Sequence, residues 1–254
     1  MKQLLLLILG WVALLLPVRA AVPPGWSTNL ATTLATGDDH SPPLLLYFTA
    51  SWCAPCQMMA RTTLTNDTVR ETLEGFKRVA LDIDEHGPVA QRYEIRAVPT
   101  FLILMPSGEP VAITTGYQDA GTFVAWLTNG ISEVTAALTR KTEVERKLAE
   151  VDEWLKGNDA ATLRRAAGEL AELCAERSEK TWKPALERLT ALARRDPLYV
   201  LDLLNHPRLV VRIQMANLLR TQLGEGFAVD PWSNAGARTN AIAPWREKLA
   251  AHQP

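Results

Sequence analysis

The sequence has few of the residues that bind metals or nucleic acids. Only three cysteines and four histidines occur among its 254 residues, whereas a structural zinc site takes four ligands that usually come as two close pairs. A single Cys-x-x-Cys spacing is present, at Cys53 and Cys56, and no second pair accompanies it. The formal net charge is −1, without the basic cluster that marks a nucleic-acid surface. Metal and nucleic-acid binding are therefore disfavoured.

Long hydrophobic runs are also missing beyond residue 20, so no later segment is apolar enough to cross a bilayer. At the start, Lys2 precedes an apolar run over residues 4–16, and small residues occupy the positions that determine cleavage in residues 17–20. This run is shorter than the roughly 20 residues of a membrane span. We expect residues 1–20 to be a signal peptide, with an uncleaved anchor as the alternative. The mature chain is then periplasmic or secreted, with no stable membrane span, where disulfides can form.

The Cys-x-x-Cys pair lies where a strand is expected to give way to a helix. Residues 44–48 form an apolar run typical of a buried strand, and residues 57–63 favour a helix. A thiolate at that junction faces unpaired N–H groups and the positive end of the helix, which lower its pKa. The pattern predicts that Cys53 is a nucleophile and that Cys56, one turn later, resolves a mixed disulfide. A purely structural disulfide and half of a metal site are the alternatives.

Residues 51–56, Ser-Trp-Cys-Ala-Pro-Cys, resemble the reactive motif of the thioredoxin family, specifically its exported thiol:disulfide interchange members. Residues 96–100, which lead into an apolar run, are similar to the family's segment with a cis-proline before a central strand. The resemblance implies a thiol-disulfide oxidoreductase that exchanges disulfides with protein substrates. It needs no cofactor and depends on a redox partner that recycles it. Residues 26–138 carry the resemblance.

The same resemblance assigns roles to individual residues. It implies that Cys53 and Cys56 are catalytic, and that Trp52, Val98 and Pro99 bind the substrate. In the family the proline lies beside the reactive sulfur, and the residue before it offers backbone hydrogen bonds to the substrate. The dipeptide between the cysteines lacks the histidine of the more oxidising members, which favours reduction or exchange.

Two departures from the family concern proton transfer. Many thioredoxins have a buried acid six residues before the first cysteine and a lysine on the neighbouring strand, and here these positions are Tyr47 and Ala80. Tyrosine is a poor base near neutral pH, because its reference pKa is about 10. Water or Glu85 could replace the acid. The departures also favour a rival interpretation, a redox-inactive adaptor whose helical region is a protein-binding scaffold.

With 254 residues and 47% hydrophobic content, the chain can bury two cores. We expect an α/β thioredoxin fold, a mixed sheet between helical layers, over residues 21–138. Its expected helices cover residues 26–36, 57–64, 66–73, 84–93 and 119–137, and its expected strands cover 44–48, 78–83, 101–105 and 111–115.

Residues 139–254 are expected to form an all-α domain of helical hairpins, because Ala, Leu, Glu and Arg recur there with a helical period. The predicted helices cover residues 143–155, 160–175, 183–194, 198–204 and 210–223. Residues 201–212 resemble a HEAT-type repeat, although only one clear repeat unit is present. Cys174 shares a helical face with Leu163, Ala167 and Leu170, so we expect it in a packing core rather than in redox chemistry.

Overall fold

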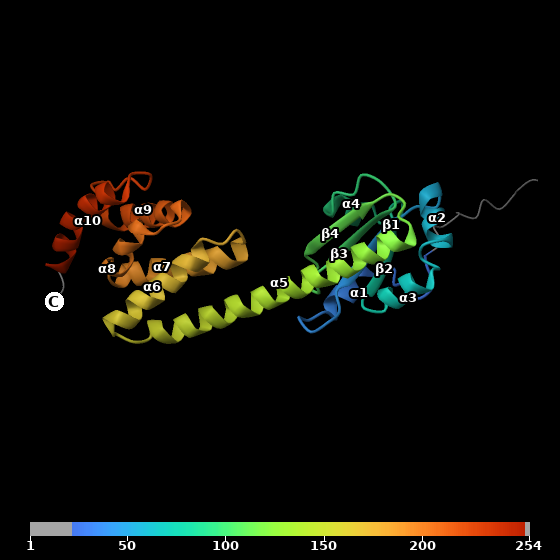
Figure 1. Ribbon diagram of the computed structural model, residues 1–254, viewed down its shortest axis with the longest axis horizontal. Helices are drawn as coiled ribbons and strands as arrows, with labels where there is room; N and C mark the ends of the chain where they lie inside the picture. The colour runs from blue at the N-terminus through green and yellow to red at the C-terminus, as the bar shows by residue number, and fades with distance from the viewer. Residues whose placement is uncertain (1–21, 252–254) are drawn as a thin grey trace, which may run out of the picture. The chain divides into compact units, whose positions relative to one another are not determined.

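The computed structural model describes residues 22–251, which form two compact units (Figure 1). The first unit ends at Leu138 and the second begins at Thr139. The expected signal peptide, residues 1–20, lies outside the described residues. Within residues 22–251, no helix combines the length and the apolar character that a membrane crossing requires.

The first unit is built on a four-stranded mixed sheet. Its strands are β1 (Leu44–Thr49), β2 (Lys77–Asp82), β3 (Thr100–Leu104) and β4 (Pro110–Thr115). They lie in the order β2-β1-β3-β4, with β1 parallel to β2 and antiparallel to β3, and β3 antiparallel to β4. The central strands β1 and β3 are buried along their whole length, which explains why their sequences are unbroken apolar runs.

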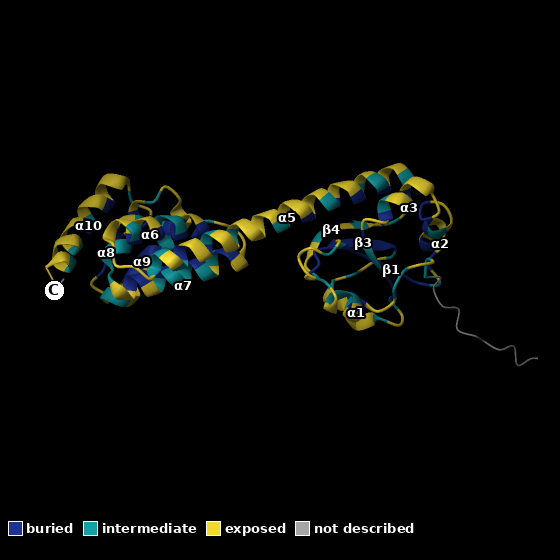
Figure 2. Ribbon diagram, turned by 90° about the horizontal axis from the view of Figure 1, so that it is seen from below, coloured by how far each residue is buried: buried dark blue, intermediate teal, exposed yellow. Residues whose placement is uncertain are grey.

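Helices cover both faces of this sheet, and Figure 2 shows α1 and α5 on opposite sides of it. The helices are α1 (Leu30–Ala35), α2 (Ala54–Arg61), α3 (Asp67–Leu73), α4 (Gly87–Arg92) and the start of α5 (Ala120–Leu155). One buried cluster, here called the α5-side cluster, includes Leu45, Tyr47, Met59, Ala80 and Phe123. The other, the α1-side cluster, includes Leu30, Leu46, Val79, Leu81 and Ala90. This arrangement confirms the predicted thioredoxin fold.

The second unit is all helical in its described part. After the end of α5 it contains α6 (Ala160–Cys174), α7 (Glu179–Arg195), α8 (Leu198–Leu201), a 3₁₀ helix (Asp202–Asn205), α9 (Leu209–Leu223) and α10 (Ala235–Ala250). The hairpin of α6 and α7 is joined by residues 175–178, and its two helices pack against each other. A single core contains Cys174 together with Leu163, Ala167 and Leu170, as the helical spacing predicts.

Some element bounds differ from the sequence-based expectation, such as that of α1, which begins at Leu30 and not at residue 26, and two helices differ in continuity or existence. The expected break between residues 137 and 143 does not exist, because α5 is continuous from Ala120 to Leu155. Residues 138–142 are Leu-Thr-Arg-Lys-Thr, which include good helix formers and neither glycine nor proline, so nothing stops the helix there. Helix α10 was not predicted. Its sequence contains Gly236 and Pro244, residues that normally weaken a helical pattern.

Candidate active site

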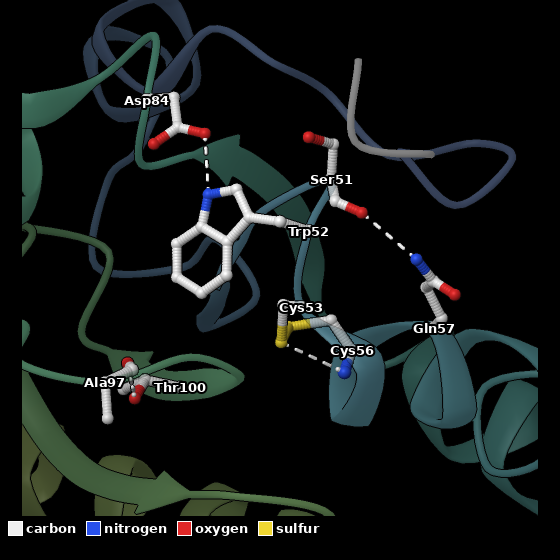
Figure 3. The surroundings of a disulfide bond; sticks show 8 residues. All are labelled: Ser51, Trp52, Cys53, Cys56, Gln57, Asp84, Ala97 and Thr100. Atoms are coloured by element: carbon white, nitrogen blue, oxygen red, sulfur yellow. Dashed lines mark hydrogen bonds between the residues drawn. A yellow bond between two sulfur atoms is a disulfide. The ribbon is translucent and has the colours of Figure 1, made fainter. Parts of the chain in front are cut away.

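The cysteine pair lies at the start of α2. Cys53 is the N-cap residue of this helix, with extended backbone angles, and Pro55 follows in the first turn. Proline is well placed there, because the N–H that it lacks would have no partner inside the helix. Cys53 and Cys56 form a disulfide with an S–S distance of 2.08 Å and a Cα–Cα distance of 5.2 Å (Figure 3). The strand-to-helix junction predicted from the sequence is therefore present.

The Cys53 sulfur accepts a hydrogen bond from the first turn of α2. The backbone N–H of Cys56 donates to Cys53 Sγ over 3.2 Å (Figure 3). A backbone N–H donor and the positive end of a helix both favour negative charge on a sulfur at such a position. The start of α2 therefore offers two features that stabilise a thiolate.

The disulfide is enclosed by three apolar side chains. Cys53 and Cys56 are each 3% exposed and pack with Ala50, which follows β1, and with Ile83 and Val98. Ile83 comes directly after β2, and Val98 comes directly before the cis-proline. The ends of two neighbouring strands and the loop before β3 therefore meet at the cysteines.

Trp52 is the exposed part of the site. Its side chain is 64% exposed, and its indole Nε1 donates a hydrogen bond of 2.9 Å to Asp84 Oδ2 (Figure 3). Asp84 lies in the turn that follows β2. The hydrogen bond holds the ring next to the disulfide with much of its surface open to solvent. Sequence reasoning selected Trp52 but missed Asp84, because only the fold brings this turn to the indole.

The loop before β3 has the conformation that the resemblance implies. The Val98–Pro99 peptide bond is cis, and Val98 contacts the cluster that contains both cysteines. The Thr100 hydroxyl donates to the Ala97 carbonyl over 2.8 Å, and the Gly116 N–H donates to the Pro99 carbonyl over 2.8 Å. These bonds fix the loop to its own strand and to the end of β4. The roles of Val98 and Pro99 in substrate binding stay predictions.

The two positions that usually handle protons in this family hold no ionised group. Tyr47 on β1 pairs with Ala80 on β2, so they are neighbours in the sheet, as expected. Tyr47 is 1% exposed and stacks on Phe101 with ring centroids 4.2 Å apart. Burial raises the pKa of Tyr47, and a hydrogen bond with the Thr49 side chain offsets only part of this effect. Tyr47 is therefore an apolar packing residue rather than a base near neutral pH.

A different acid is buried near this position. Asp82, the last residue of β2, is 8% exposed and pairs with Thr49 on β1. Glu85, the substitute considered from the sequence, is exposed. Sequence reasoning missed Asp82, although the available signal was its place two residues after Ala80 on the same strand, since alternate residues share a face. No three His, Cys, Asp or Glu side chains within residues 22–251 are grouped so that they could hold a metal ion.

Known proteins resemble the first unit. The thioredoxin family model matches residues 28–129. A thioredoxin-like protein of Synechocystis sp. is 34% identical over 85 residues, which are 34% of this chain and 78% of that protein. Thioredoxin of Rickettsia bellii is 29% identical over 89 residues, covering 35% of this chain and 82% of its own length.

A solved thioredoxin from Thermus thermophilus is 26% identical, with a TM-score of 0.40, and the match covers 44% of this chain and 90% of that one. The matching family model ends at residue 129, inside the first unit. Thioredoxin relatives and a close cysteine pair support a general role in thiol-disulfide oxidoreduction. Because the family model matches residues 28–129 and the 34% identical relative is covered over 78% of its length, the chain belongs to the thioredoxin family.

Proposed function

We propose that the protein is an exported thiol-disulfide oxidoreductase that exchanges disulfides with protein partners through its Cys-Ala-Pro-Cys dithiol. The observation that carries this proposal is the position of Cys53, whose sulfur accepts the Cys56 N–H at the start of α2. A thiolate stabilised in this way is a nucleophile near neutral pH. A buried structural disulfide has no need of an exposed tryptophan beside it, and Trp52 is 64% exposed.

The reaction proceeds by two thiol-disulfide exchanges. The Cys53 thiolate attacks one sulfur of a partner disulfide, a mixed disulfide forms, and the other partner sulfur leaves as a thiolate. Cys56 then gives up its proton and attacks Cys53 Sγ, so that the second partner sulfur leaves and the Cys53–Cys56 disulfide forms. Two electrons pass from the dithiol to the partner, and the reverse sequence oxidises a partner. A separate redox partner restores the starting state, and no cofactor takes part.

The partner binds over the exposed edge of the site. Trp52 offers a large, partly apolar surface next to the reactive sulfur, and such rings contribute strongly to protein recognition. Val98 precedes the cis-proline Pro99 and contacts the cysteine cluster, which supports the proposal that its backbone groups pair with an extended segment of the partner. Trp52, Val98 and Pro99 are thus the proposed substrate-binding residues.

The helical unit, which we interpret as a HEAT-like module, is proposed to select or position a partner. Its exposed large apolar residues, Leu209, Val210 and Trp232, supply surface for such contacts. The rival function, a redox-inactive adaptor, draws support from Tyr47 and Ala80, which replace the usual acid and lysine. The intact cysteine pair at a helix start favours the enzyme. We place the protein in the periplasm or outside the cell on the basis of residues 1–20.

A trapping experiment tests the proposed function. In the Cys56→Ser variant the mixed disulfide cannot be resolved, so covalent adducts through Cys53 should accumulate in the exporting cell and disappear on reduction. In an insulin reduction assay with dithiothreitol, the Cys53→Ser variant should be no faster than the reductant alone. Cys174→Ala, which removes the remaining thiol, should keep the full rate. A wild-type protein without reductase activity, together with a Cys56→Ser variant without adducts, would support the adaptor instead.

A further inference from the structure

The second exchange step requires a proton acceptor that the sequence-based expectation did not identify. Cys56 must lose its proton before it attacks Cys53 Sγ, because the thiolate is the nucleophile. Its side chain is 3% exposed, which restricts direct proton loss to bulk water. Tyr47 occupies the usual position of the acid but is buried with a raised pKa. The acceptor must therefore be another group near the start of α2.

Asp82 is the one carboxylate among the described residues that is buried. On β2, Val79 and Leu81 belong to the α1-side cluster, whereas Ala80 belongs to the α5-side cluster. Because side chains alternate along a strand, Asp82 lies on the same face as Ala80. It is thus two residues further along the strand than the position where the family usually has lysine, and on the same face of the sheet.

This face and this end of the strand lead to the cysteines. Helix α2 packs on the same face, since Met59 belongs to the α5-side cluster, and Cys56 lies one turn before Met59. The residues that follow Thr49 and Asp82 in the chain, Ala50 and Ile83, both pack in the cluster with Cys53 and Cys56. The paired ends of β1 and β2 therefore lie at the end of the sheet where the dithiol is, and Asp82 is the buried carboxyl group at that end, on the face that α2 covers.

We propose that Asp82 accepts the proton of the Cys56 thiol during the resolving step, an inference that rests on the proposed function. The Cys56 S–H bond breaks and its proton passes to the Asp82 carboxylate. The Cys56 sulfur then forms a bond with Cys53 Sγ, the bond between Cys53 and the partner sulfur breaks, and the partner leaves as a thiolate. The carboxylate is regenerated when the proton passes on to solvent.

The turn after β2 holds the carboxylate in place. The Asp84 N–H donates to Asp82 Oδ1 over 3.0 Å, and the Asp82 carbonyl lies 3.1 Å from His86 Nδ1. The other titratable groups of this neighbourhood are Tyr47 on β1, the thiols of α2, and Asp84, Glu85 and His86 in the turn. Asp84 bonds to Trp52, and Asp84 and Glu85 are exposed. Asp82 is thus the carboxyl group of this set that is shielded from water.

A purely structural role for Asp82 is the alternative, because its bond to the Asp84 N–H stabilises the turn. The variant Asp82→Asn separates the two roles. Asparagine keeps a side-chain oxygen that accepts from the Asp84 N–H, and its shape is nearly the same, but it cannot accept the thiol proton. Glu85→Gln is the matched control, since it removes an exposed carboxylate from the same turn.

The test follows the reaction of the reduced protein with Ellman's reagent, a small aromatic disulfide, by stopped flow. The first release of chromophore reports attack by Cys53, and the second reports attack by Cys56 on the mixed disulfide. In Asp82→Asn we expect the first chromophore release to keep its wild-type rate. The second release should be slower than in the wild type on the order of 10²-fold at about pH 6, which is a typical loss of rate when a general base is removed. The deficit should shrink towards about pH 9, where an ordinary thiol with a pKa of about 8.5 ionises without assistance. Glu85→Gln should match the wild type throughout.

Two results would overturn the proposal. If the second release in Asp82→Asn stays within twofold of the wild-type rate at every pH, Asp82 takes no proton. If the second release is slowed by the same factor at every pH, the effect of the substitution is structural. Asp82→Glu keeps a carboxylate and should stay within tenfold of the wild type at about pH 6, so a rate as low as that of Asp82→Asn contradicts the proposal as well. Failure of the proposed function is distinct, because a wild-type protein that forms no mixed disulfide gives no first release.

Discussion

Cys53 and Cys174 are both almost fully buried, with 3% and 1% of their surfaces exposed, yet they lie at opposite ends of their helices. Cys53 precedes the first residue of α2, where a backbone N–H donates to its sulfur. Cys174 is the last residue of α6, and its thiol donates to the Trp182 carbonyl over 3.8 Å. Burial raises the pKa of the Cys174 thiol from an ordinary value of 9.0 to about 12.

The difference shows that burial by itself does not make a cysteine reactive. At the start of a helix the unpaired N–H groups and the dipole stabilise a thiolate and offset its loss of solvation. At the end of a helix the dipole destabilises a thiolate. The first unit therefore has a sulfur in the position that suits the proposed nucleophile, and the second has one that behaves as a small apolar side chain. The first prediction below alters the helical unit and measures the response of the dithiol, and the others compare how each unit responds to its own substitution.

The largest expected effect is the loss of a core leucine in the helical unit. Leu170 is fully buried in the same cluster as Cys174, so Leu170→Ala should lower the free energy of unfolding of this unit by about 2–5 kcal/mol. Urea unfolding followed by circular dichroism measures this cost. Leu209→Ala, at a position 37% exposed, is the matched control and should change the transition little. The two releases from Ellman's reagent should keep their wild-type rates in both variants, and a slower first release in Leu170→Ala would mean that the dithiol depends on the helical core.

A smaller effect is expected from two glycines, one on each side of the boundary at Leu138. A Cβ at Gly130 in α5 would clash with Ile103 Cδ1 on β3, so the end of this buried side chain would have to shift to admit a methyl group. Overpacking a core destabilises the folded state by about 1–3 kcal/mol, whereas replacing glycine with alanine inside a helix stabilises it by about 1 kcal/mol. Gly130→Ala should therefore destabilise the first unit by about 1 kcal/mol net.

Gly168 in α6 supplies the opposite case. A Cβ there meets no atom within 4 Å, so Gly168→Ala should stabilise the helical unit by up to about 1 kcal/mol through helix propensity alone. Thermal unfolding of the two variants measures the contrast. Stabilisation by both substitutions would show that the Ile103 side chain rotates away at no energetic cost. The close approach of α5 to β3 would then not require glycine at position 130.

The sequence predicted the reactive end of the first unit well, because its signals are local. Pro55 after Cys53, the apolar run before them and the residues around Pro99 each specify their own backbone geometry. The pairing of Tyr47 with Ala80 was also expected, and the observed register confirms it.

Other features depend on contacts that local sequence does not contain. Asp82 is the last residue of β2 and is followed by an acidic turn, and strand register and the packing of the helices show that its side chain is buried. The composition changes at Thr139, but such a change can mark a domain boundary without ending a helix, and α5 continues to Leu155. In α10, tertiary packing around Ile242 overrides the weak helical signal of residues 235–250.

The smallest expected effect concerns Cys174 at high pH. The native state holds the thiol proton up to about pH 12, whereas the unfolded chain releases it near the ordinary pKa of 9.0. Between these values the native state binds more protons, so the free energy of unfolding falls as pH rises through this window. Buried Tyr47 and half-buried Tyr93, whose pKa values are also raised, lie in the first unit and are the same in the wild type and in a Cys174→Ala variant. Urea midpoints of the helical unit between about pH 8 and about pH 11 should therefore decline less steeply in Cys174→Ala. Equal slopes would mean that Cys174 ionises in the native state as readily as in the unfolded chain, and the contrast with Cys53 would then rest on the hydrogen bond from Cys56 alone.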